Sequence, residues 1–160
     1  MITSSTNTLD ADRRLEDALR RVWGFSGFRP LQREAMLAIL ASRDSVVVLP
    51  TGGGKSLCFQ APAVVQPRGV AVVISPLISL MKDQVDGLRV DGVAAAYLNS
   101  SQTADERDAV VASLREDRCR LLYVSPERIA GDGGPALRSL LQQSGVGFIA
   151  VDEAHCISQW

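Results

Sequence analysis

The sequence is poor in the residues that build disulfide scaffolds, metal clusters and aromatic binding surfaces. It has one histidine, and aromatic residues make up 5% of its 160 positions. Its three cysteines, Cys58, Cys119 and Cys156, are odd in number and far apart, and no CxxC pair occurs. This spacing argues against a disulfide framework or a cysteine metal site and is typical of a protein in the reducing cytoplasm.

An excess of charge and a long apolar run are also missing. Lys and Arg number 17 against 18 Asp and Glu, so the formal net charge is −1. A dedicated nucleic-acid module is usually basic, so any contact with nucleic acid must be local. No apolar run approaches the roughly 18 residues of a membrane span. Residues 1–8 are polar and lack a signal-peptide core, so we expect a disordered, frayed leader there.

What the sequence does contain is the composition of a globular domain, with 46% apolar and 22% charged residues. The pattern shows no repeat, low-complexity block or linker, so we expect one domain over residues 9–160. Apolar spacing predicts helices over about 10–23, 30–41, 57–65, 77–90, 103–116 and 135–143. Short apolar runs predict buried strands over 46–49, 70–75, 93–97, 121–124 and 146–151. Such alternation predicts an α/β fold with three layers around a mostly parallel central sheet.

A glycine-rich loop lies between the predicted strand 46–49 and the predicted helix 57–65. It reads Leu49-Pro50-Thr51-Gly52-Gly53-Gly54-Lys55-Ser56. Glycines allow several N–H groups to point at one anion, and the positive end of the next helix adds to that field. Lys55 can reach the β- and γ-phosphates of a nucleotide, and the Ser56 hydroxyl can ligate Mg²⁺. The alternative is a glycine turn beside a surface lysine, since the general motif has glycine where Leu49 stands.

A pair of carboxylates, Asp152 and Glu153, directly follows the predicted strand 146–151. Ligands of open parallel sheets sit at the carboxyl ends of strands, so we expect this pair on the same rim as the glycine loop. Asp152 can hold the Mg²⁺ that bridges the phosphates, and Glu153 can polarise the attacking water. The alternative is that both side chains simply leave the strand into solvent.

The loop together with Asp152-Glu153-Ala154-His155 resembles superfamily 2 helicases, whose loops do not require glycine at the Leu49 position. Longer strings are similar to the RecQ helicases, and the similarity covers about residues 23–160. These strings are Leu49-Pro50-Thr51-Gly52-Gly53-Gly54-Lys55-Ser56-Leu57-Cys58-Phe59-Gln60, Ser75-Pro76-Leu77-Ile78-Ser79-Leu80-Met81-Lys82-Asp83-Gln84-Val85, Tyr123-Val124-Ser125-Pro126-Glu127-Arg128 and Asp152-Glu153-Ala154-His155-Cys156-Ile157-Ser158-Gln159-Trp160.

The resemblance implies a RecA-like P-loop NTPase lobe that is incomplete at its C-terminus, with ATP and Mg²⁺ as cofactors. It also implies 3′-to-5′ unwinding of DNA, with single-stranded DNA and duplex junctions as partners. The second lobe, which would supply an arginine to the transferring phosphoryl group, is missing from this chain, so we expect the isolated chain to be inactive. Two alternatives are a non-enzymatic nucleotide-binding fragment and a related RNA helicase, although the tail 156–160 argues against the latter.

The resemblance also assigns an adenine-binding segment. In it Gln32 would read the adenine edge, Phe25 would stack on the base and Arg29 would lie beside it. Many relatives carry tyrosine at the Phe25 position. The alternative is a loop leading into a helix, with Phe25 and Phe28 filling the core, and for Phe28 a core position is the favoured reading.

Further residues resemble those that touch DNA. They are Pro76 after Ser75, Lys82, Arg128 after Ser125-Pro126, and the terminal Gln159 and Trp160, which resemble the start of an aromatic-rich loop that senses single strands. His155 resembles the residue that couples nucleotide state to the DNA side. Alternatively, Lys82 is an ordinary solvated helix residue, and His155 is a hydrogen-bonded structural residue.

Overall fold

The computed structural model describes the backbone of residues 3–159 and the side chains of residues 8–156. The chain divides into two compact units, Met1–Pro67 and Arg68–Trp160. This division does not test whether residues 9–160 form one domain, so that expectation stays a prediction. Within the described residues, no helix combines the length and apolar character needed to cross a membrane.

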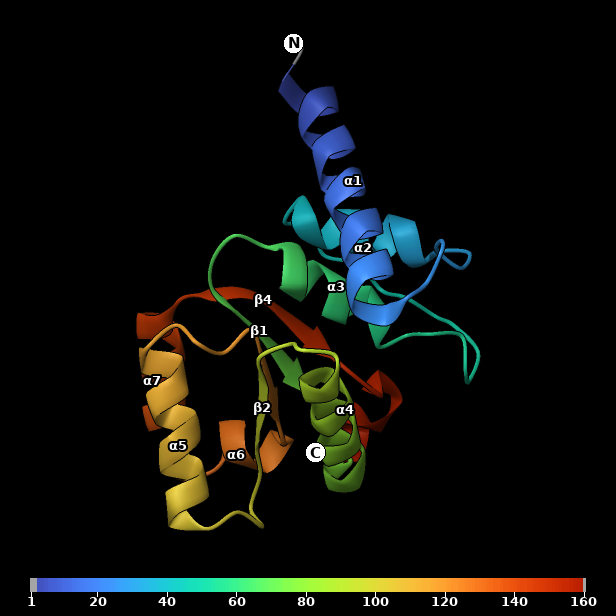
Figure 1. The fold of residues 1–160 in the computed structure, drawn as a ribbon. Coiled ribbons are helices and arrows are strands. Elements are labelled where there is room, and N and C mark those ends of the chain that lie inside the picture. Colours follow the sequence, from blue (N-terminus) through green and yellow to red (C-terminus); the bar gives the residue numbers. More distant parts are fainter. Residues whose placement is uncertain (1–2, 160) are drawn as a thin grey trace. The chain divides into compact units, whose positions relative to one another are not determined.

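The first unit consists of three helices: α1 (Thr3–Trp23), α2 (Gln32–Leu40) and α3 (Leu57–Val65) (Figure 1). The bounds of α3 are those expected, whereas α1 begins at Thr3 rather than near Asp10 and includes residues 3–8, where the sequence suggested a frayed leader. No glycine or proline interrupts residues 3–23, so the helix continues until Gly24, whose φ of 68° ends it.

The three helices share a small apolar core. Leu15 and Leu19 of α1 are buried against Met36 of α2 and against Leu57 and Ala61 of α3. Each fully buried leucine contributes about 2 kcal/mol relative to an exposed one. Phe28 packs against the same cluster, which confirms its expected place in the core.

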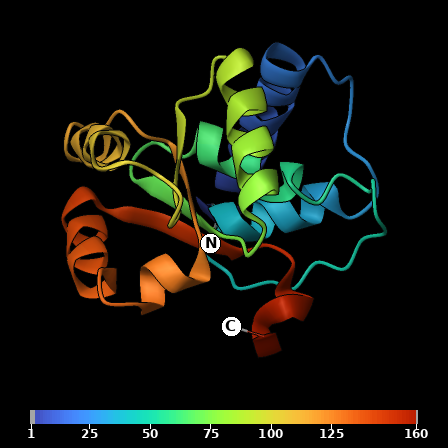
Figure 2. The ribbon, with the colours of Figure 1, turned by 90° about the horizontal axis from the view of Figure 1, so that it is seen from below.

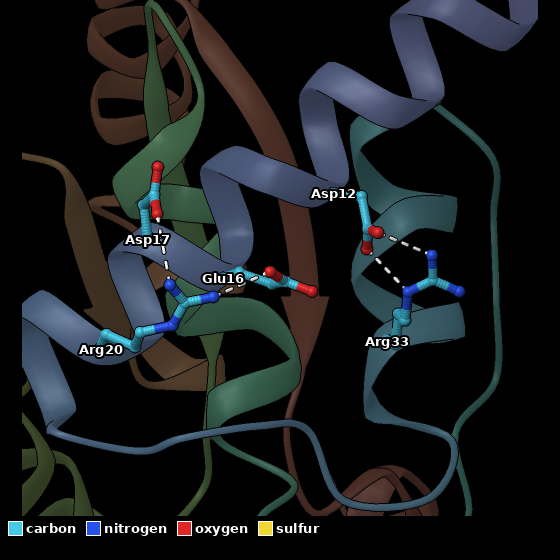
Figure 3. A network of polar contacts seen from close by, with 5 residues as sticks. All are labelled: Asp12, Glu16, Asp17, Arg20 and Arg33. Atoms are coloured by element: carbon cyan, nitrogen blue, oxygen red, sulfur yellow. Dashed lines mark hydrogen bonds and ion pairs between the residues drawn. The ribbon is translucent and has the colours of Figure 1, made fainter.

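An ion pair fixes the first turn of α2 against α1 (Figure 3). The Arg33 guanidinium binds the Asp12 carboxylate through two hydrogen bonds, Nε to Oδ1 at 2.7 Å and Nη2 to Oδ2 at 2.6 Å. The hydrogen bond from Arg33 holds the pKa of the Asp12 carboxyl below its usual value. Figure 3 also shows Arg20 bound to Glu16 and Asp17 within α1.

The strand expected over residues 46–49 is absent, so this prediction was wrong. Residues 43–50 belong to no helix or strand, and Val46 and Val48 are 93% and 82% exposed. A strand exists only when its backbone groups pair with those of a neighbour. The described residues of the Met1–Pro67 unit contain no other strand, so valine-rich sequence alone does not produce one here.

The second unit is an α/β sandwich with a four-stranded parallel sheet. Its elements are β1 (Val70–Ile74), α4 (Ile78–Val90), β2 (Ala95–Leu98), α5 (Ala104–Arg115), β3 (Leu121–Val124), α6 (Pro126–Ala130), α7 (Gly134–Ser144), β4 (Val146–Val151) and the 3₁₀ helix η1 (Ala154–Gln159). The strands lie in the order β2-β3-β1-β4, and every pair is parallel. The α/β fold class with a parallel sheet is thus confirmed.

Helices cover both faces of this sheet, as Figures 1 and 2 show. Helices α5 and α7 pack on one face, where Leu114 and Leu140 meet Val72 and Val124 of the strands. Helix α4 lies on the other face and buries Met81 and other apolar residues. Successive side chains along each strand point to opposite faces of the sheet. Because both faces are covered by helices, apolar residues occur without interruption along each strand.

The start of α5 has the capping box that the sequence predicts. The Glu106 N–H donates to Thr103 Oγ1 at 3.3 Å, and the Thr103 N–H donates to the Glu106 carboxylate at 2.8 Å. Helices α6 and η1 have no counterpart among the predicted elements. They span five and six residues, which is too short for helical periodicity to stand out.

Candidate functional site

The glycine loop between Pro50 and Ser56 requires glycine at two of its positions. The Gly53 N–H donates to the Pro50 carbonyl at 2.9 Å, and a Cβ atom on Gly53 would lie 2.8 Å from that oxygen. At Gly54 the φ angle is 79°, and a Cβ atom there would lie 2.4 Å from Gln32 Nε2. Side chains at these positions would change the shape of the loop.

Backbone N–H groups collect where the loop enters α3. The amides of Cys58, Phe59 and Gln60 bond to the carbonyls of Lys55 and Ser56. The N–H groups of residues 54–57 donate no hydrogen bond within the described part of the chain. Four consecutive free amides at the positive end of a helix are donors of the kind that bind anions such as phosphate.

Lys55 brings its charge to this loop. Its side chain is half-buried, and Nζ lies 3.4 Å from the Leu49 carbonyl, which is a long contact that a stronger acceptor would displace. The Ser56 side chain caps no helix N–H. These contacts leave Lys55 and Ser56 free to meet a bound ligand, and their roles toward phosphate and magnesium stay predictions.

Two of the three residues expected to bind adenine contact the glycine loop through hydrogen bonds. The Arg29 guanidinium donates to the Gly52 carbonyl at 2.5 Å, and Gln32 Nε2 donates to the Gly54 carbonyl at 3.0 Å. Gln32 is 2% exposed, whereas Phe25 is 50% exposed and so presents part of its ring to solvent. Sequence reasoning missed these contacts with the loop, since nothing local marks residues 20 or more positions apart as neighbours.

In the second unit, the motifs that follow the strands lie side by side along one edge of the sheet. The Ser125 N–H donates to the Leu98 carbonyl at 3.1 Å, the Ser75 N–H to the Val124 carbonyl at 3.1 Å and the Asp152 N–H to the Ile74 carbonyl at 2.9 Å. These bonds continue the parallel ladder by one residue. They place Ser125, Ser75 and Asp152 in a row at the carboxyl ends of the strands.

The carboxylate pair stands at the end of that row. Asp152 is 8% exposed, and its Oδ1 accepts the Glu153 N–H at 3.0 Å. Asp152 therefore does not point freely into solvent. Glu153 has a φ of 50°, a conformation that L residues rarely adopt and that is often found at functional sites. Its Oε2 lies 3.3 Å from Nδ1 of His155, which is 76% exposed.

The residues expected to contact DNA differ in their surroundings. Lys82 is exposed and forms an ion pair with Asp86 at 2.5 Å, which raises the pKa of the lysine. Arg128 is half-buried, and its Nε has no hydrogen-bond partner among the residues that the structure describes. Within the same residues, the buried hydroxyls of Ser75 and Ser125 also lack a partner. Pro76 is half-buried. The Gln159 side chain and all of Trp160 lie outside the described residues.

A phosphate loop and an acidic pair after a parallel strand are together typical of the P-loop nucleoside triphosphatases. Comparison with known proteins agrees: the profile of the family "DEAD/DEAH box helicase" matches residues 29–160. The chain belongs to the DEAD/DEAH box helicase family.

Several curated relatives of this chain carry the names of DNA helicases. "ATP-dependent DNA helicase RecQ" of Pasteurella multocida is 49% identical over 90% of this chain and 22% of the relative. The protein of the same name from Synechocystis is 47% identical over 94% of this chain and 31% of the relative. "ATP-dependent DNA helicase Q5" of Rattus norvegicus is 44% identical over 94% of this chain and 16% of the relative. The resemblance to RecQ helicases is thus confirmed, and the chain spans less than a third of the length of each of these relatives.

Proposed function

We propose that the whole protein is an ATP-dependent 3′-to-5′ DNA helicase of RecQ type, and that this chain forms part of its ATP-binding lobe. The observation that carries the proposal is a row of four free amides, those of residues 54–57, in a loop that contains three glycines and Lys55. The names of the relatives, which are ATP-dependent DNA helicases at 44–49% identity, support the nucleotide and the substrate.

In this proposal the loop from Thr51 to Ser56 binds the triphosphate of ATP. The free N–H groups of residues 54–57 donate to phosphate oxygens, and Lys55 leaves the Leu49 carbonyl to bind the β- and γ-phosphates. Phe25 is exposed enough to stack on adenine, with Arg29 and Gln32 beside the base. The four free amides support this assignment, because they leave donors for several phosphate oxygens at once.

Magnesium fits the oxygen donors of the two motifs. The Ser56 hydroxyl and the Asp152 carboxylate are hard oxygen ligands of the kind this ion prefers, together with phosphate oxygens. Bound there, the ion would neutralise charge on the phosphates. Glu153 positions and polarises the attacking water, and its contact with His155 links this carboxylate to a side chain that faces solvent.

DNA is the proposed polymer substrate, and the carboxyl edge of the sheet is the proposed contact surface. Pro76 and Arg128 lie just after neighbouring strands, and Lys82 lies on the helix that follows the first of them. Gln159 and Trp160 are proposed to stack on or bond to unpaired bases. A second lobe would supply the arginine that accelerates phosphoryl transfer by about 10³–10⁵ in related systems.

The three cysteines are free thiols, which supports a cytoplasmic location as part of this proposal. Burial raises the pKa of the Cys119 thiol to about 11 and raises that of Cys58 as well. Both therefore stay protonated and unreactive at neutral pH.

The experiment that tests the function measures ATP hydrolysis by the full-length protein, with and without single-stranded DNA. We expect weak hydrolysis that DNA stimulates, and we expect Lys55→Ala to abolish turnover because it removes the charge that binds the phosphates. Arg13→Ala, on the exposed surface of α1, is the control and retains the wild-type rate. An undiminished rate in Lys55→Ala would contradict the proposal.

The same assays separate the alternatives. Stimulation by RNA in place of DNA would identify an RNA helicase. For the isolated 160-residue chain we expect negligible strand displacement and at most weak ATP binding, so measurable unwinding by it would refute the need for a second lobe. Nucleotide binding without hydrolysis by the full-length protein would identify a non-enzymatic nucleotide-binding protein.

A further inference from the structure

The side chain of Gln32 is fully engaged with the protein backbone. Its Oε1 accepts the N–H of Arg29 at 2.8 Å, and its Nε2 donates to the carbonyl of Gly54 at 3.0 Å. It is 2% exposed, so the second bond connects a buried amide to a loop residue 22 positions away. A buried amide bound at both ends cannot rotate without losing a hydrogen bond.

This contact determines the direction of the next peptide N–H. A trans peptide is planar, so the Gly54 carbonyl and the Lys55 N–H point in opposite directions. Because Gln32 attracts the carbonyl, the Lys55 N–H points away from Gln32, and that N–H has no partner among the described residues. The contact thus keeps the Gly54 carbonyl oxygen away from the side toward which the Lys55 N–H points.

Arg29 acts on the same loop two residues earlier. Its guanidinium donates to the Gly52 carbonyl, and the N–H of the same peptide, that of Gly53, donates to Pro50. Gly52 and Gly54 both have positive φ, and glycine backbone turns between conformations at little cost. Without these side-chain contacts, a peptide of the loop can flip and present its carbonyl oxygen to a phosphate.

The helix that carries Gln32 is anchored to the rest of the first unit at two points. Gln32 is the first residue of α2, and the next residue, Arg33, binds Asp12 of α1 through two hydrogen bonds. Met36, one turn further along α2, is fully buried in the helical core. The helix that carries Gln32 is therefore anchored independently of the loop, while the Gln32 amide itself bonds to Arg29 and to Gly54.

We propose that Gln32 is a positioning residue of the phosphate loop: by binding the Gly54 carbonyl it orients the Lys55 N–H for phosphate, whatever base the nucleotide carries. Arg29 supports it through Gly52. The inference rests on the proposed nucleotide binding and deepens it, because the role expected from sequence was recognition of adenine alone. The two roles differ in what they predict for a ligand that has phosphates and no base.

The test compares magnesium tripolyphosphate with magnesium ATP in calorimetric titrations of the full-length protein. The variant is Gln32→Met, which keeps the length and volume of the side chain and removes both hydrogen bonds. Gln142→Ala, on the exposed surface of α7, is the matched control. We expect Gln32→Met to weaken tripolyphosphate binding about tenfold, the effect of losing the buried hydrogen bond to the Gly54 carbonyl, and to weaken ATP binding at least as much.

The outcomes distinguish this inference from the proposed function. If the wild-type protein binds neither ligand, the proposed function fails. If Gln32→Met binds ATP more weakly and tripolyphosphate normally, Gln32 reads only the base and the inference is overturned while the function stands. Normal binding of both ligands also overturns it. Should Gln32→Met not fold, Gln32→Asn decides, since its shorter amide cannot reach both partners and is expected to weaken tripolyphosphate binding in the same direction.

Discussion

The glycine loop of the first unit and the sheet edge of the second are held in opposite ways. The loop keeps its shape through two side chains, Arg29 and Gln32, that reach it from another segment. The sheet edge keeps its shape through backbone hydrogen bonds that extend the parallel ladder to Ser75, Ser125 and Asp152. The ladder therefore positions the ends of its strands through main-chain atoms, whereas the loop depends on two particular side chains.

The largest expected effect is that of a side chain at Gly54. Gly54→Ala places Cβ 2.4 Å from Gln32 Nε2, at a φ of 79° that alanine disfavours, so the loop must change shape. We expect loss of ATP affinity by more than about 100-fold, or roughly 3 kcal/mol, in a binding titration. Gly87→Ala is the control: nothing lies within 4 Å of its added methyl group in α4, and we expect stabilisation by about 1 kcal/mol. Normal ATP binding by Gly54→Ala would contradict the need for glycine at this position of the loop.

A substitution in the sheet should reduce stability and leave phosphate binding unchanged. Leu122 in β3 is completely buried, and Leu122→Ala leaves a cavity that we expect to cost about 3 kcal/mol of unfolding free energy, measured by urea denaturation. At temperatures where the protein stays folded, tripolyphosphate affinity should be unchanged, because residues 51–56 are outside the sheet. Val90→Ala, at an 87% exposed position, is the control with little effect on stability. A loss of phosphate affinity in Leu122→Ala would show that the loop depends on the sheet as well.

The smallest effect concerns the Asp12–Arg33 pair, which fixes the helix that carries Gln32. The hydrogen bond from Arg33 lowers the pKa of the Asp12 carboxyl in the folded protein. A lowered carboxyl pKa stabilises the fold above the unfolded pKa, near 3.9, and this stabilisation is lost as pH falls through the folded pKa. We expect Asp12→Asn to lower the melting temperature slightly at pH 7 and to differ less from wild type near pH 3. Equal differences at both pH values would contradict the assignment.

Local sequence was a good guide wherever an element depends on its own residues. The bounds of α3, β3 and β4 and the capping box of α5 follow from apolar runs and end signals within each segment. A signal for α6 was present in Ser125-Pro126-Glu127, where proline and an acidic residue open a helix. The prediction of a strand over 46–49 was wrong because the valines of this run favour a strand but cannot supply the neighbouring strand with which it would pair.

From sequence alone we could predict the chemistry that we propose for this protein: a glycine loop with Lys55 and Ser56, and the carboxylates Asp152 and Glu153 after a strand. Residue type and local spacing are enough for such a prediction, because anions and magnesium ions prefer particular donor groups, which can be read from the sequence. Only the tertiary structure decided that Gln32 and Arg29 hold the loop and that residues 46–49 form no strand. Those outcomes depend on hydrogen bonds between distant segments, and their geometry is set by packing and not by local sequence.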